Sequence, residues 1–168
     1  MMMHEQAAER IVVGVDQSPT ARSILEFAVR EAIRRGARLD VVTAYHDPQY
    51  WAIAYGVPAP PVNPGLSSIL LSGTKKLVDE VVGEIPGGRT NLAAIRVDAL
   101  PGSAANVLLA AAEGADLLVV GHRGHGGFTS MVLGSVGMQC VLHAPCPITV
   151  VRPTTAAVSV RKLEGARS

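Results

Sequence analysis

Glycines gather in one short stretch in the second half of the chain. Positions 121–127 read Gly-His-Arg-Gly-His-Gly-Gly, so four of seven residues are glycine. With few side chains in the way, successive backbone amides there can turn toward a single anion, and phosphate is the natural ligand. A second segment, Gly134 to Val136, follows. Gly134 would let the backbone approach a ligand closely, Ser135 offers a hydroxyl and an amide, and amides near a helix start attract negative charge. The alternative is a flexible crossover loop that binds nothing, because a glycine-rich loop alone is a weak signal.

Two nucleotide-binding motifs are present only in incomplete form. Residues 83–90 read GEIPGGRT and nearly spell a Walker phosphate loop, but Arg89 stands where that loop requires lysine. The segment also lies between a helix and a following strand, which is the reverse of the order the loop needs. No complete G-x-G-x-x-G follows the first strand, which argues against a dinucleotide dehydrogenase.

Histidine and cysteine side chains offer weaker chemistry. A zinc site could be imagined at Cys140, His143 and Cys146, but these residues supply three ligands at most and span a helix end. The alternative to a zinc site is two buried thiols and a histidine at the helix end. His122 and His125 could stabilise phosphate charge or act as acid and base, but no activated nucleophile or G-x-S-x-G elbow lies nearby. Solvated loop histidines are the competing interpretation.

The glycine-rich stretch lies within an alternation of aliphatic strands and amphipathic helices, which predicts a parallel α/β sheet with right-handed crossovers. Ser18 is expected to cap the first helix, with Pro19 in its first turn. Arg96 places a charge inside the third strand, which suits a sheet edge. Strands are expected at 11–15, 39–45, 92–97, 117–120 and 147–151, and helices at 19–36, 67–83, 103–113 and about 129–143.

Three segments lie outside this alternation. Residues 47–65 contain five prolines together with Tyr50, Trp51 and Tyr55, and they read as a long loop and a candidate lid. Residues 1–10 and 153–168 are expected to be flexible, which leaves one domain over residues 11–152.

Composition narrows the function classes. The 168 residues are 48% hydrophobic but only 4% aromatic, as expected for an aliphatic core between helices and a parallel sheet. A net charge of +1 gives no general attraction to nucleic acid or to an anionic membrane. The apolar runs are too short to span a membrane, and no apolar secretion segment is seen. With only two cysteines, we expect a cytoplasmic protein with reduced thiols.

Four spaced positions resemble a known family. Gly121, Gly124, Gly134 and Ser135 match the G-x2-G-x9-G-(S/T) pattern of ATP-binding universal stress proteins, with the same placement between the fourth strand and the next helix. Residues 11–19, IVVGVDQSP, are similar to the first strand and turn of that family. Residues 141–152 are similar to its closing strand.

The resemblance implies a Rossmann-like five-stranded sheet of order 3-2-1-4-5 that binds ATP, with Mg²⁺ as the expected metal. Asp16 would lie near the ribose and the metal, although it could instead help to cap the first helix. Backbone groups of Ala44 would recognise the donor and acceptor edge of adenine. Gln17 and His122 depart from the glycine and serine that are common in the family. The implied ligand-binding residues are Gly14, Val15, Asp16, Ala44, Gly121, His122, Arg123, Gly124, His125, Gly126, Gly127, Gly134, Ser135 and Val136.

The function implied by the resemblance is nucleotide-dependent regulation in a stress response, through an unidentified protein partner and with slow ATP hydrolysis at most. Three alternatives stay open: a nucleotide hydrolase or phosphotransferase, a cyclic AMP-binding protein, and an interaction protein without nucleotide.

The closing strand predicts self-association. Ile148, Thr149, Val150 and Val151 form an apolar, β-branched run at what the family order makes a sheet edge. Because proteins usually cover or pair such an edge, we expect a homodimer in which two copies of this strand run antiparallel.

Overall fold

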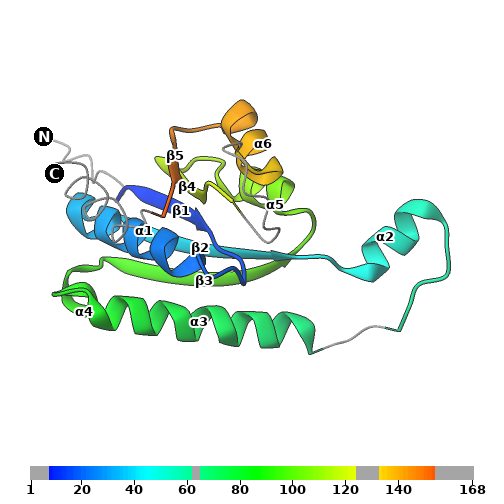
Figure 1. Cartoon of the computed structure of the whole chain (residues 1–168), viewed down its shortest axis with the longest axis horizontal. Helices are drawn as coiled ribbons and strands as arrows, with labels where there is room; N and C mark the ends of the chain where they lie inside the picture. Colours follow the sequence, from blue (N-terminus) through cyan, green and yellow to red (C-terminus); the bar gives the residue numbers. More distant parts are fainter. Residues whose placement is uncertain (1–7, 62–64, 124–132, 154–168) are drawn as a thin grey trace, which may run out of the picture.

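The computed structural model describes residues 8–61, 65–123 and 133–153 (Figure 1). Within these ranges, five parallel strands form one sheet in the order β3-β2-β1-β4-β5, and this confirms the expected open α/β fold. The strands are β1 (Arg10–Gly14), β2 (Arg38–Tyr45), β3 (Ala94–Pro101), β4 (Leu117–Gly121) and β5 (Ile148–Val151).

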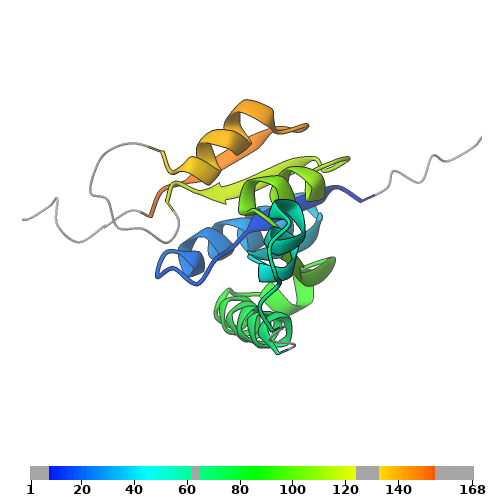
Figure 2. The same cartoon turned by 90° about the vertical axis from the view of Figure 1, so that its right-hand side faces the viewer.

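Helices cover both faces of the sheet (Figures 1 and 2). One face carries α1 (Ala21–Arg35) and α3 (Leu66–Glu84), with the short α4 (Gly88–Asn91) beside them, and the other carries α5 (Ala104–Ala111) and α6 (Ser135–His143). The central strands β1, β2 and β4 are buried on both sides, because alternate residues such as Val12 and Val13 enter opposite cores. Each such aliphatic side chain contributes about 1.5–3 kcal/mol when it leaves water.

The outer strands differ in character. Strand β3 is an edge, as its internal charge predicted, and Arg96 forms an ion pair of 2.7 Å with Asp98 there. It runs from Ala94 to Pro101, further than predicted, because it pairs with β2 along its whole length. Strand β5 is the other edge, and all of its residues are half-buried.

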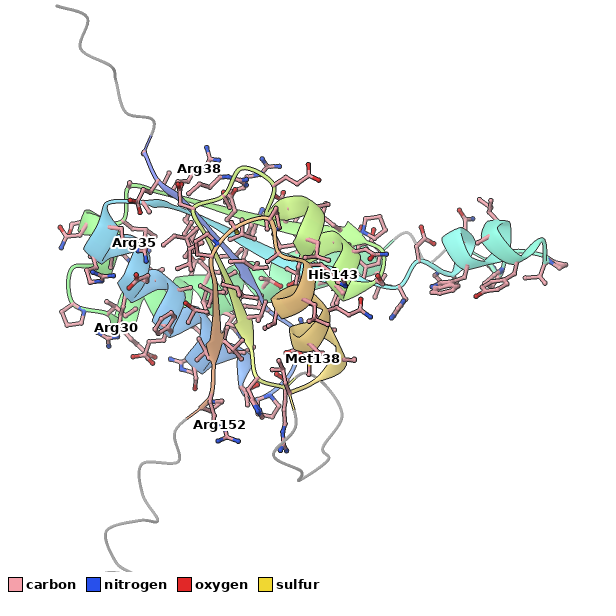
Figure 3. The ribbon with its side chains drawn as sticks, turned by 90° about the horizontal axis from the view of Figure 1, so that it is seen from above. Arg30, Arg35, Arg38, Met138, His143 and Arg152 are labelled. Atoms are coloured by element: carbon pink, nitrogen blue, oxygen red, sulfur yellow. The ribbon has the colours of Figure 1, made fainter. Side chains whose placement is uncertain are left out.

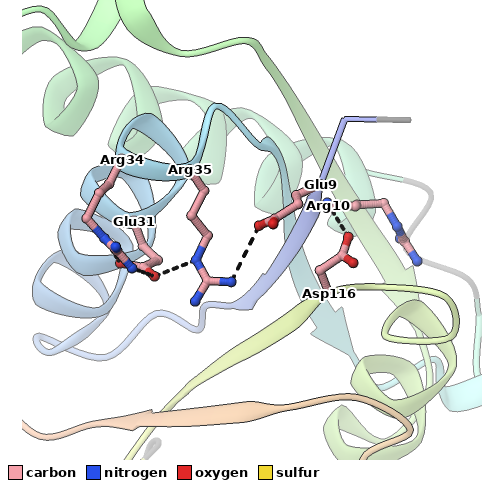
Figure 4. A network of polar contacts seen from close by, with 6 residues as sticks. All are labelled: Glu9, Arg10, Glu31, Arg34, Arg35 and Asp116. Atoms are coloured by element: carbon pink, nitrogen blue, oxygen red, sulfur yellow. Dashed lines mark hydrogen bonds and ion pairs between the residues drawn. The ribbon is translucent and has the colours of Figure 1, made fainter. Parts of the chain in front are cut away.

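Charged residues close the amino end of the sheet. The backbone amide of Arg10 donates to the Asp116 carboxylate at 2.8 Å, and its guanidinium pairs with Asp40 at 3.1 Å. Arg35 joins α1 to the start of β1 through Glu9 at 3.5 Å (Figure 4). This end of the strands is occupied by structural contacts, which leaves the carboxyl end for a ligand.

Two helix starts differ from the prediction. Helix α1 begins at Ala21 with Thr20 as its N-cap, so Ser18 does not cap it. Instead the Ser18 amide donates to Asp16 Oδ1 at 2.9 Å, and this turn delays the helix. Helix α6 begins at Ser135 rather than near position 129, because Gly134 takes extended torsions of φ −60° and ψ 160°.

The expected loop over residues 47–65 contains a helix, α2 (Pro48–Tyr55), that lies apart from the sheet (Figure 1). Asp47 caps it by accepting the Gln49 amide at 2.9 Å, and Pro48 occupies the first helical position. Gly56 ends it with φ of 64°. These capping signals are present in the sequence, but the five prolines of residues 47–65 favoured a loop. No helix within the described ranges is long and apolar enough to cross a lipid bilayer.

Candidate functional site

The strand order reverses between β1 and β4, and ligands of open parallel sheets bind beyond the carboxyl ends of the strands at such a point. Val15 and Asp16 follow the end of β1, and His122 and Arg123 follow the end of β4. The two strands are direct neighbours, with Val13 opposite Val119. Residues that are far apart in the sequence therefore lie at neighbouring strand ends on the carboxyl side of the sheet.

The start of α6 is fixed against the end of β4. Gly134 is the N-cap of α6, and its amide donates to the His122 carbonyl oxygen at 3.0 Å. No side chain within the described part of the chain caps this helix. The following residues are the exposed Ser135 and the half-buried Val136. Amides in the first turn of a helix lack partners in the helix and carry partial positive charge, so this end suits an anion.

The predicted glycines at two strand ends have a second role in packing. A Cβ on Gly14 would lie 2.6 Å from Leu108 Cδ1 of α5. A Cβ on Gly121 would overlap Ile24 Cδ1 of α1, on the other face of the sheet. Each glycine thus lets a helix approach the strand end closely. The sequence alone implied only a ligand-binding role for both glycines, because the opposing side chains could not be identified without the fold.

Asp16 is held in a turn rather than at a helix cap. Its Oδ1 accepts the Ser18 amide, and the residue is half-buried. The preceding residue, Val15, is fixed to β2, since its amide donates to the Val42 carbonyl oxygen at 3.0 Å and its carbonyl accepts from the Thr43 hydroxyl at 3.1 Å. Ala44 follows Thr43 near the end of β2. The structure therefore places Val15, Asp16 and Ala44 on adjacent strand ends.

The β4 and β5 ends of the site are electropositive. Desolvation, followed by the charges of Arg152 and Arg123, lowers the pKa of His122 below its ordinary 6.5. Arg152 directly follows β5 at the carboxyl end of the sheet (Figure 3). Sequence reasoning missed Arg152, although its position after the last strand could have indicated it. An anion at this end would meet two guanidinium groups and an imidazole.

A magnesium ion would find one protein ligand here. Asp16 supplies a carboxylate beside the electropositive end, which fits an ion held mainly by phosphate oxygens and water. Within the described ranges, no three His, Cys, Asp or Glu residues are grouped to hold a metal by themselves. Burial raises the pKa of the Cys140 and Cys146 thiols, so both are poor nucleophiles. The predicted residues Gly124, His125, Gly126 and Gly127 lie outside the described ranges.

Solved structures with the same fold cover most of the chain. The universal stress protein UspA from Lactobacillus plantarum superposes with a TM-score of 0.61 and 24% identity, over 87% of this chain and 99% of that one. A universal stress protein in complex with cAMP gives 0.59 and 23%, over 88% and 99%. The Archaeoglobus fulgidus protein in complex with dAMP gives 0.58 and 22%, over 84% and 96%.

Curated relatives are more similar in sequence. A universal stress protein of Thermus aquaticus is 34% identical over 147 residues, which are 84% of this chain and 97% of that protein. One from Mycolicibacterium smegmatis is 32% identical over 146 residues, which are 85% of this chain and 45% of that protein. This chain spans about half the length of several relatives that it matches.

The model of the universal stress protein family matches residues 7–152, which include every described strand, the neighbouring ends of β1 and β4 and the start of α6. The fold, the relatives and this match agree. The chain belongs to the universal stress protein family.

Proposed function

We propose that this protein binds ATP with Mg²⁺ at the carboxyl end of the sheet and acts as a nucleotide-dependent regulator in a stress response. The observation that carries the proposal is the bond from the Gly134 amide to the His122 carbonyl oxygen at 3.0 Å. It sets the start of α6, which no side chain caps, beside the end of β4, and Asp16 follows the end of the neighbouring strand β1. Amides at the start of a helix suit phosphate, and a carboxylate suits a ribose hydroxyl or a metal ion, so these two groups support a nucleotide at the carboxyl end of the sheet.

Each part of the nucleotide has a candidate partner. The amides of Ser135 and Val136, with the glycine-rich residues 121–127, bind the phosphates, and Asp16 accepts ribose hydroxyls or holds Mg²⁺. Val15 and the Ala44 backbone contact adenine. Support for an adenine nucleotide comes from the neighbouring structures in complex with cAMP and dAMP. Support for ATP in particular comes from the spaced Gly121, Gly124, Gly134 and Ser135 motif.

The protein is proposed as a binding protein rather than a committed enzyme. No residue among the described site positions is arranged as a nucleophile with its base, so hydrolysis would rely on the metal and water. A turnover above about one per second, as in ordinary enzymes, would favour the hydrolase or phosphotransferase alternative.

A homodimer through β5 is part of the proposal. Strand β5 is in contact with α6, whose exposed apolar side chains are Met138, Val141 and Leu142. Such an apolar strip beside an edge strand favours pairing with a second copy. The regulatory protein partner and a cytosolic location complete the proposal; Cys140 and Cys146 are free thiols, which suits a reducing compartment.

The test is to identify the nucleotide released when the freshly purified protein is denatured. Mass spectrometry should find ATP at close to one molecule per chain. Release of cyclic AMP instead would replace ATP as the ligand, and an empty protein that also fails to take up added ATP would contradict nucleotide binding. Asp16→Ala should weaken binding by about 1.5–3 kcal/mol, as expected for a charged hydrogen bond.

A further inference from the structure

Two buried hydroxyl groups contact each other near the end of β2, next to the proposed position Ala44, and neither of them caps a helix. Thr43 of β2 and Thr74 of α3 are each only 2% exposed, and their Oγ1 atoms lie 3.1 Å apart. Burying a hydroxyl is unfavourable unless it is hydrogen-bonded, and a valine of the same shape would avoid that cost. The pair therefore calls for an explanation.

The Thr43 hydroxyl continues the contact between β1 and β2 past the end of their ladder. Paired residues end at Gly14 opposite Val42. One position further, the Val15 amide still bonds to the Val42 carbonyl oxygen, and the Val15 carbonyl accepts from Thr43 Oγ1 at 3.1 Å. Both backbone groups of Val15 are thus held by β2.

The residues that this bond joins precede Asp16 and Ala44, which are two of the positions proposed to contact the nucleoside. Val15 is followed by Asp16, and Thr43 is followed by Ala44. Because adjacent peptide units share rigid planes, fixing the Val15 carbonyl restricts where the Asp16 carboxylate can lie. The same bond holds the end of β2 at a set distance from the end of β1.

Thr74 competes for the same proton. Its hydroxyl also donates to the Leu70 carbonyl oxygen at 2.9 Å, so two hydroxyl protons are shared among three contacts. If Thr43 donates to Thr74, then Val15 loses its partner. Removing the Thr74 hydroxyl would leave the Thr43 proton for Val15 alone, so the two threonines should not be equivalent.

We infer that Thr43 is a positioning residue for the nucleotide site, whose hydroxyl fixes the Val15–Asp16 peptide and holds Asp16 at the right distance from Ala44. The inference rests on the proposed nucleotide binding for its effect on affinity. Its effect on Asp16 itself does not depend on any ligand.

The ligand-independent test is amide hydrogen exchange at Ser18, whose N–H donates to Asp16 Oδ1. Thr43→Val should speed that exchange by about tenfold, because one hydrogen bond that orders Asp16 is lost. Thr43→Ser keeps the hydroxyl and should restore protection. Thr74→Val is the matched control, since it removes an equally buried hydroxyl yet should leave Ser18 exchange within about twofold of wild type.

The ligand-dependent test is calorimetry with MgATP on the same variants. Thr43→Val should weaken ATP binding by about five- to tenfold, while Thr43→Ser and Thr74→Val stay within about twofold. In an Asp16→Ala background the effect of Thr43→Val should fall to about twofold or less, since Thr43 acts through Asp16.

The outcomes separate this inference from the proposed function. If wild type binds no ATP, the proposed function fails, while Ser18 exchange still decides whether Thr43 positions Asp16. If ATP binds, and folded Thr43→Val leaves both affinity and Ser18 exchange unchanged, the positioning role is overturned. Equal losses in Thr43→Val and Thr74→Val, measured as exchange, affinity and urea midpoint, would also overturn it in favour of a merely structural role for the pair.

Discussion

The backbone of His122 joins the end of β4 to two other elements through Gly134 and Val151. The His122 carbonyl accepts the Gly134 amide at 3.0 Å, and the His122 amide donates to the Val151 carbonyl oxygen at 2.8 Å. The proposed phosphate end of α6 and the edge strand β5 therefore meet at one residue. Desolvation, followed by the charges of Arg152 and Arg123, lowers the pKa of its imidazole below the ordinary value.

We expect ATP affinity to rise as pH falls through the pKa of His122, because protonation adds a positive charge beside Arg152 and Arg123. That pKa is lowered from 6.5, so the free protein disfavours the charged form. Because the pKa of His122 is lower in the folded protein than in the unfolded chain, the contribution of His122 to stability is present above pH 6.5 and is lost as pH falls through the folded-state pKa. Calorimetry from neutral to mildly acidic pH should show the rise in wild type and a flat profile in His122→Gln; equal profiles would remove His122 from the site.

Acid stability should depend on Glu31 of α1. Hydrogen bonds from Arg34 and Arg35 lower its pKa from 4.5 to about 2 (Figure 4). A lowered folded-state pKa means that the stabilisation is complete above 4.5 and is lost as pH falls toward 2. Because the arginines are solvent-exposed, we expect Glu31→Gln to cost only about 1 kcal/mol at pH 7 in urea unfolding. Glu26→Gln, which breaks a single exposed pair with Arg30, is the control and should cost less.

The segment that resembles a Walker loop should affect stability and not nucleotide binding. A Cβ on Gly88 would overlap the Val82 carbonyl oxygen, a backbone atom that cannot move aside easily. Gly88→Ala should therefore destabilise the fold by about 1–3 kcal/mol. Gly83→Ala meets only the flexible end of Arg89 at 3.4 Å and should be neutral or stabilising. A loss of ATP affinity in a folded Gly88→Ala variant would contradict this assignment.

Dimerisation through β5 should be sensitive to charge at its centre. In an antiparallel pair of β5 strands, Val150→Lys would bring like charges together and shift the protein toward monomer. Leu100→Lys, on the opposite edge strand β3, is the matched control and should leave the mass unchanged. Light scattering at micromolar concentration measures both. A monomeric wild type, or a fully dimeric Val150→Lys variant, would exclude this strand as the main interface.

The sequence predicted the parts of the fold that depend on local pattern. Aliphatic β-branched runs located the strands, and the family resemblance implied the order in which β1 and β4 are neighbours. Close packing could not be predicted in this way, because the need for glycine at position 14 depends on Leu108 of a distant helix. The hydroxyl bond from Thr43 to Val15 likewise required the register of β1 on β2. Helix α2 was missed for a different reason, since proline content was given more weight than the cap at Asp47.

The proposal that the phosphates of ATP bind at the start of α6 can be tested by calorimetric titration of MgATP into wild type, Gly134→Val and Gly73→Ala. Gly134 has torsions that any residue can adopt, so valine there should leave the fold intact and simply occupy phosphate space. Gly73 is an exposed position of α3 with nothing within 4 Å of its Cβ position, and alanine there serves as the control. We expect wild type and Gly73→Ala to bind ATP equally. Folded Gly134→Val should bind ATP at least about tenfold more weakly, since the loss of one charged hydrogen bond already weakens binding by that much. Unchanged affinity in Gly134→Val would contradict the proposal.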